Sequence, residues 1–281
     1  MTTKHLRMRR DCFQCRWLGL LALLVLSGGA GSWLRATTPL SADEVMQKAV
    51  ERARWSAAQH ARPNYTYTKI TVLEDLEASG KVKDRKEKLY EAVFDSGLTY
   101  LRLVKVNGKA LPAGELKKQE ERELKDRETL AQRKTAKGGD DRENFLTSEL
   151  IAKYHFAMVD RKSVTGRPAY VLTFQPKPGL PQKQAADRLL NHLAGKLWID
   201  EQEFEIAKIE IHLQSEVTLW GGLLASLKQF TFTLSRTRIE DGVWFNARSM
   251  GDFEGRKLLD NAHFRTQSES TNFRRIERRR G

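Results

Sequence analysis

Apolar and polar residues alternate along much of this chain, most clearly in its second half. In residues 206–213, apolar side chains fall on one face and polar ones on the other; the apolar set is Ala207, Ile209, Ile211 and Leu213. Phe230, Phe232 and Leu234 follow the same rule in residues 229–239, where threonines and serines occupy the other face. A period of two is that of a β-strand with one buried and one solvated face. Both segments are therefore predicted to be antiparallel strands.

Further strands are predicted at residues 65–73, 88–95, 98–106, 156–160, 169–175, 195–200, 243–254 and 257–268. Asn107-Gly108 supplies the positive φ angles of a tight hairpin turn, and Asp200 stands at a second turn, where acidic residues are common. A sheet of about nine to eleven strands must curl to protect its edges. We expect an α+β fold: a large curved antiparallel sheet forming an unclosed barrel, with helices packed on its concave face.

Three segments have helical patterns. Ser41 and Glu44 fit a capping box, and the following residues to about His60 carry an apolar stripe that we expect to pack on the sheet; the stripe is Val45, Met46, Ala49, Val50 and Ala53. Residues 182–194 predict a short helix. A charged helical excursion is predicted within residues 113–150, because residues 115–132 alternate in charge at i,i+4 spacing. We expect it to be solvated; the alternative is an arm that docks a partner.

The N-terminal segment 1–36 has the layout of a secretory signal peptide, with basic residues, an uncharged run and then small residues. The alternative is an uncleaved inner-membrane anchor at 17–34, near the roughly 20 residues needed to span a bilayer. Cys12 and Cys15 both lie in this segment. We expect a mature chain of residues 37–281, a single domain without thiol chemistry, that is exported or stays anchored with this domain outside the cytoplasm.

No residue pattern in the sequence predicts catalysis. It contains no HExxH, GxSxG, Walker or GxGxxG motif, so we expect no enzyme, catalytic residue, metal or cofactor. The formal net charge of +13 is compatible with nucleic acid, with an anionic membrane surface or with no specific partner, and export makes nucleic acid the least suitable of the three. The basic tail at 274–280 would give transient contact with a membrane surface, or is simply a solvated end.

The order of these parts resembles the LolA/LolB-like lipoprotein-sorting half-barrels, which include the RseB-type sensor domain. The resemblance is carried by YTYTKITV, VNGKAL, GRPAYVLTFQP, GKLWIDEQEFEIAKIEI and IEDGVWFNARSMGDFEGRKLL, in that order along the chain. It implies a non-catalytic, monomeric periplasmic protein that holds a lipid, an acyl chain or a lipoprotein. A sensor or scaffold that binds an envelope protein is the alternative. The charged excursion and the helix at 182–194 are absent from the compact carriers.

This resemblance points to two groups of candidate ligand-binding residues. The first would line an apolar cavity on the concave face: Ile209, Ile211, Leu213, Phe230, Phe232 and Leu234. The second would lie on a loop at the mouth of that cavity: Trp220, Leu223 and Leu224. The alternatives are ordinary core beneath the helices for the first group and a buried connection between strands for the second.

Overall fold

The computed structural model describes residues 39–59, 65–95, 98–135, 146–182, 185–219, 225–239, 242–257 and 260–276. The predicted signal or anchor segment lies outside the described residues, as does the predicted loop of Trp220, Leu223 and Leu224. From Leu40 to Gly281 the chain forms one compact unit.

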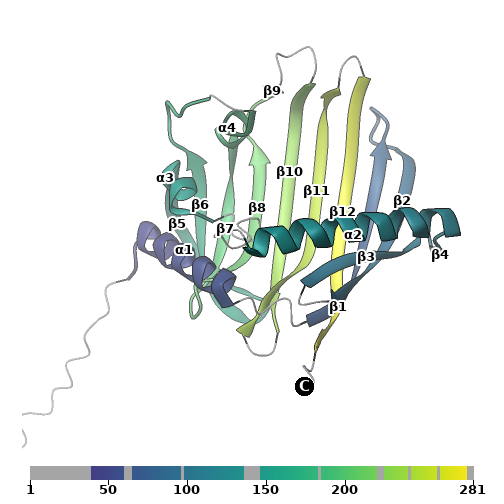
Figure 1. Ribbon diagram of the computed structural model, residues 1–281. Helices are drawn as coiled ribbons and strands as arrows, with labels where there is room; N and C mark the ends of the chain where they lie inside the picture. Colours follow the sequence, from purple (N-terminus) through teal and green to yellow (C-terminus); the bar gives the residue numbers. More distant parts are fainter. Residues whose placement is uncertain are drawn as a thin grey trace, which may run out of the picture. The chain divides into compact units, whose positions relative to one another are not determined.

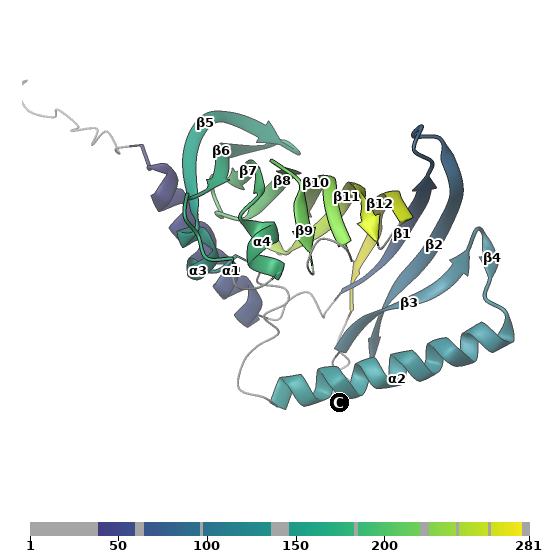
Figure 2. The same cartoon turned by 90° about the horizontal axis from the view of Figure 1, so that it is seen from above.

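Twelve described strands make one antiparallel sheet, which curves and stays open between its edge strands β4 and β5 (Figures 1 and 2). Its order is β4-β3-β2-β1-β12-β11-β10-β8-β7-β6-β5, and β9 pairs with β10. The strands are β1 (Tyr65–Leu76), β2 (Val82–Asp95), β3 (Leu98–Val106), β4 (Lys109–Ala110), β5 (Tyr154–Val164), β6 (Arg167–Pro176), β7 (Leu193–Asp200), β8 (Ile206–Leu213), β9 (Val217–Leu219), β10 (Ala225–Arg238), β11 (Trp244–Lys257) and β12 (Asp260–Arg275). The predicted architecture is confirmed. Two strands of only two and three residues, β4 and β9, take the number above the expected range because such pieces are too short to alternate visibly.

Helix α1 (Ala42–Gln59) begins with the predicted capping box, in which Ser41 N donates to Glu44 Oε2 at 2.8 Å and Glu44 N donates to Ser41 Oγ at 3.3 Å. Its predicted stripe is buried and packs against the apolar face of β6, β7, β8 and β10. With α3 (Ser148–Ala152) and α4 (Ala185–Leu190), it lies on the concave side of the sheet (Figure 2). This part of the concave face is therefore filled core.

Two predicted boundaries were wrong, each for a packing reason. The helix expected at 182–194 is only α4, because Leu193 already pairs with Leu213 in the sheet. The turn expected at Gly255 is instead part of β11, where a Cβ on Gly255 would lie 2.2 Å from the Ser226 carbonyl oxygen of β10. That glycine allows two strands to approach closely, and the strand continues to Lys257.

The expected charged helix is α2 (Ala113–Thr135), which runs alongside β3, the neighbour of the edge strand β4 (Figure 2). Gln119 Nε2 donates to the Leu103 carbonyl at 2.9 Å, and Arg102 donates to both carboxylate oxygens of Glu123 at 3.0–3.3 Å. Leu116 and Leu124 remain exposed. The helix is thus held near the edge of the sheet by polar contacts, and Gln119 pairs with one backbone carbonyl of β3.

Replacing Arg102 with Ala is expected to release α2 while leaving the sheet folded. The buried carboxylate of Glu123 would lose its arginine partner and keep only the bond from Gln119 of the same helix, so it would regain solvent by moving away with the helix. Hydrogen exchange should show faster exchange across residues 113–135, with global stability lowered by less than about 1 kcal/mol. Lys118→Ala, which breaks only an exposed pair with Glu115, is the control. Unchanged protection of α2 in Arg102→Ala would contradict this account of how the helix is held.

Candidate functional site

The concave face of β8 and β10 is where the first group of predicted residues meets. Leu234 pairs with Ile209 and Phe232 with Ile211 across the two strands, so these four side chains share the face that α1 covers. Ile209 and Leu234 are buried in the core, whereas Ile211 and Phe232 are partly buried at its border. Leu213, on the same face, is half-buried. On β10 the filled core therefore ends near Phe232, two residues along the strand from the buried Leu234.

Beyond this border, four phenylalanine rings continue across β10, β11 and β12 on the same face. We call Phe230, Phe232, Phe253 and Phe264 the aromatic strip. The ring centroids are 6.4 Å apart for Phe230–Phe232, 5.0 Å for Phe230–Phe253 and 4.8 Å for Phe253–Phe264. Phe264 remains 43% exposed. The strip is therefore an apolar surface on the concave side that the helices do not fully cover.

Gly251 gives the strip its compact packing. A Cβ at this position would lie 2.6 Å from Cε2 of Phe253 and 3.2 Å from the Thr266 methyl group. The Phe253 ring therefore folds over the backbone of Gly251, next to the ring of Phe264. Sequence reasoning missed Phe253 and Phe264, because their place beside Phe230 depends on the register of β10, β11 and β12.

The concave face becomes polar on β12, β1 and β2. Thr71 and Ser268 oppose each other, with their hydroxyl oxygens 3.0 Å apart. Lys69 pairs with Ser270 on one side and Tyr90 on the other. Burial lowers the pKa of Lys69 and raises that of Tyr90. One continuous face thus carries filled core, an exposed aromatic strip and a polar region in succession.

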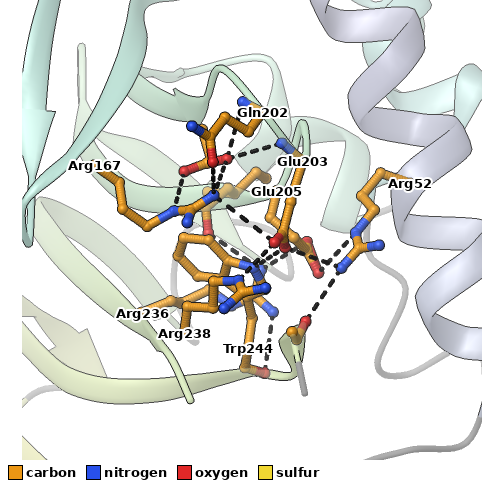
Figure 3. Close-up of polar contacts among 11 residues, drawn as sticks. Arg52, Arg167, Gln202, Glu203, Glu205, Arg236, Arg238 and Trp244 are labelled. Carbon is orange, nitrogen blue, oxygen red and sulfur yellow. Dashed lines mark hydrogen bonds and ion pairs between the residues drawn. The ribbon is translucent and has the colours of Figure 1, made fainter. Parts of the chain in front are cut away.

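A cluster of charged side chains lies where β6, β7, β10 and β11 meet α1 (Figure 3). Asp200 is fully buried and accepts two hydrogen bonds from Arg167, at 2.6 and 2.9 Å. It also accepts from the backbone N–H groups of Gln202 and Glu203. Burial alone would raise the pKa of Asp200, but these bonds and the charge of Arg167 hold it below its ordinary value. Asp200 fixes the β7–β8 turn, as its position there suggested.

Glu203 ties this turn to α1, β10 and β11. Its carboxylate accepts from Arg238, from Trp244 Nε1 at 2.8 Å and from Arg52 Nη2 at 3.3 Å. The Arg52 guanidinium also donates to the Gly242 carbonyl at 3.3 Å. Since Arg52 belongs to α1 (Ala42–Gln59), the cluster fastens the second half of that helix to the sheet.

Glu205 and Arg236 form the most buried ion pair of this cluster, with Nη1 and Oε2 3.1 Å apart. Arg236 also donates to the carbonyls of Ile206 and Trp244. Every carboxylate of the cluster is thus held by arginines, which favours a structural role. Within the described ranges, no group of His, Cys, Asp and Glu side chains could hold a metal ion.

A groove of about 480 Å³ lies between α1, α3 and β5. Its lining mixes apolar side chains such as Met46 and Ile151 with the charged Glu51 and Arg54. In its wall, the Tyr154 hydroxyl donates to the Leu190 carbonyl at 2.7 Å, and burial raises the pKa of Tyr154 to about 12. That phenol therefore stays neutral. The mixed lining makes this groove less suited to an acyl chain than the aromatic strip.

Among the described helices, none is both long and apolar enough to cross a bilayer. No family model and no curated protein matches the chain.

Solved structures do match over most of the chain. A LolA superfamily protein from Nitrosomonas europaea shares 11% identity, with 85% of this chain and 94% of that one covered and a TM-score of 0.29. A domain described as an outer membrane lipoprotein-sorting protein from Vibrio parahaemolyticus shares 13%, with 83% and 95% covered and a TM-score of 0.30. The Pseudomonas aeruginosa MucA/MucB complex matches at 12%, with 82% and 99% covered and a TM-score of 0.22.

At identities of 11–13% and TM-scores of 0.22–0.30, we base the functional proposal on this chain's own residues.

Proposed function

We propose that the protein is a non-catalytic binding protein that holds an acyl chain of a lipid or lipoprotein on the concave face of its sheet. The aromatic strip is the observation that carries this proposal. Its four rings form a continuous apolar surface at the edge of the filled core. Contiguous exposed apolar surface of this kind is typical of a ligand or partner site.

The chemistry of an acyl chain suits this surface. Each methylene removed from water contributes about 0.8 kcal/mol, so a chain laid over the rings gains affinity without a polar partner. The curvature of an open sheet leaves its concave side wider than its own side chains fill. The predicted residues Phe230 and Phe232 belong to this site, whereas Ile209 and Leu234 support it from the core.

The proposed location follows from the N-terminal pattern, which is that of an exported chain, and from the lack of cysteine after residue 15. An exported lipid-binding protein of this kind would act as a monomer in the periplasm. It would pass its ligand between membranes or between a membrane and a protein partner.

Two measurements test the binding proposal. Native mass spectrometry of the chain, purified without detergent from bacterial envelopes, should show an added mass equal to that of a lipid. Titration with an uncharged dansyl-labelled acyl amide should raise and blue-shift the dansyl emission, because the probe moves from water to an apolar surface. Recovery of ligand-free protein only, together with no dansyl response, would refute the proposal.

A further inference from the structure

Basic side chains on the two faces of β1, β2, β11 and β12 have different surroundings. On the convex face, Arg85 pairs with Glu87 at 3.2 Å, Arg248 with Glu269 at 2.9 Å and Arg265 with Asp252 at 3.2 Å. On the concave face, by contrast, the side chains of three lysines form no ion pair or hydrogen bond with the described residues: Lys69, Lys86 and Lys88. Three unpaired lysine side chains thus lie on the side that carries the aromatic strip.

Two of these lysines lie among hydroxyl groups. Lys69 is flanked by Ser270 and Tyr90, and Lys88 pairs with Thr71, whose hydroxyl meets that of Ser268. Diagonal neighbours across antiparallel strands are roughly 7–8 Å apart, so the two lysines can contact one ligand group together. We call the six residues the lysine–hydroxyl patch: Lys69, Thr71, Lys88, Tyr90, Ser268 and Ser270.

Carboxylates on this face lie away from the centre of the patch. Asp75 and Asp84 oppose each other at the far end of β1 and β2. Asp75 is six residues along β1 from Lys69, which corresponds to about 20 Å. Lys69 is moreover half-buried, and its burial lowers its pKa. An anion placed beside Lys69 would pair with its ammonium group in partly desolvated surroundings, where a charge pair is stronger than in water.

The patch and the aromatic strip share strand β12. Ser268 and Phe264 lie on the same face, four residues and about 13 Å apart, and Phe264 pairs with Phe253 of the strip. A ligand lying along β12 would thus meet rings at one end and ammonium and hydroxyl groups at the other. These two chemistries match the two ends of an acyl lipid that has an anionic headgroup.

We propose that the lysine–hydroxyl patch is the headgroup subsite and that the ligand is an acyl lipid with a phosphate-bearing anionic headgroup. This inference rests on the proposed acyl-chain site and adds the class of lipid. Lys69 and Lys88 neutralise the phosphate, and the hydroxyls of Thr71, Ser268 and Ser270 donate hydrogen bonds to its oxygens. A free phosphate would use the same groups but would gain nothing from the strip.

Lysophosphatidylglycerol and lysophosphatidylcholine of equal chain length, each below its micelle-forming concentration, provide the test. Both compete with the uncharged dansyl probe on the full chain. We expect the anionic lipid to bind about tenfold more tightly than the zwitterionic one. In the double variant Lys69→Gln/Lys88→Gln this preference should fall below about twofold, with the affinity for the uncharged probe unchanged. Lys69→Arg should retain the preference.

Lys105→Gln is the matched control, because Lys105 is exposed and pairs with Leu89 on the opposite face of β2 and β3. It removes one charge and should keep the preference. A double variant that still prefers the anionic lipid would overturn the headgroup assignment. If glycerol phosphate binds as tightly as the lysolipid, the ligand is a free anion and its assignment as a lipid is wrong. Failure of the wild type to bind the uncharged probe would instead refute the acyl-chain site itself.

Discussion

Replacing Asp200 with Asn is expected to lower the free energy of unfolding by about 3–5 kcal/mol at pH 7. Asp200 is fully buried and accepts hydrogen bonds from Arg167 and from two backbone N–H groups. The neutral amide keeps one oxygen acceptor, but its NH₂ group would face the Arg167 guanidinium, which has only donors. The partly buried Arg167 would then lose its buried carboxylate partner, and the β7–β8 turn would lose part of its support.

The pH dependence of this effect has a definite sign. The pKa of Asp200 lies below its ordinary value, so its stabilising contribution is fully present above the unfolded-state pKa of about 3.9. That contribution disappears as the pH falls through the lower pKa of the folded state. The free energies of unfolding of wild type and Asp200→Asn, measured with denaturant, should therefore show their full difference at pH 7. The difference should become progressively smaller below about pH 4.

Glu210→Gln is the matched control for this experiment. Glu210 pairs with Lys208 at the surface of the neighbouring strand, and 42% of its side chain is exposed. Its loss should cost less than about 1 kcal/mol at any pH. A cost of similar size for Asp200→Asn, or a cost that does not shrink in acid, would show that the buried cluster does not stabilise the fold in this way.

Truncating both Phe253 and Phe264 to Ala is expected to weaken binding of the uncharged acyl probe about 100-fold, which corresponds to about 2.7 kcal/mol. Phe264 is the exposed ring of the aromatic strip, and the half-buried Phe253 stacks on it. Aromatic residues in apolar contact sites commonly contribute more than about 1 kcal/mol each. The probe would lose apolar contact area on β11 and β12, whereas the core beneath α1 stays intact. The dansyl titration measures the change directly.

Met250→Ala supplies the control on the same strand, because Met250 is exposed on the opposite face of β11, where it pairs with Thr233. Its truncation should leave probe affinity within about twofold. Circular dichroism and thermal unfolding of both variants separate loss of binding from loss of fold. Wild-type affinity in a folded Phe253→Ala/Phe264→Ala variant would remove the strip from the site.

Much of the architecture follows from local patterns. The capping box at Ser41 and Glu44, the apolar stripe of α1 and the Asn107-Gly108 hairpin are all present as predicted, with φ values of 49° and 75° at the hairpin. The alternation in β8 and β10 identified the buried face of each strand correctly. Such features depend on residues within a few positions of each other, where backbone geometry fixes the period.

Only the tertiary structure decided which strands are neighbours. The register places Phe264 beside Phe253 and Ser268 beside Thr71, although Thr71 and Ser268 are 197 residues apart. The charged cluster likewise gathers Arg52, Arg167 and Arg236 from three distant elements. The sequence by itself determined the curved antiparallel sheet and its apolar face, because alternation is a local property of the strand. It did not determine the aromatic strip, the lysine–hydroxyl patch or the cluster, because register results from the combined packing of the whole sheet.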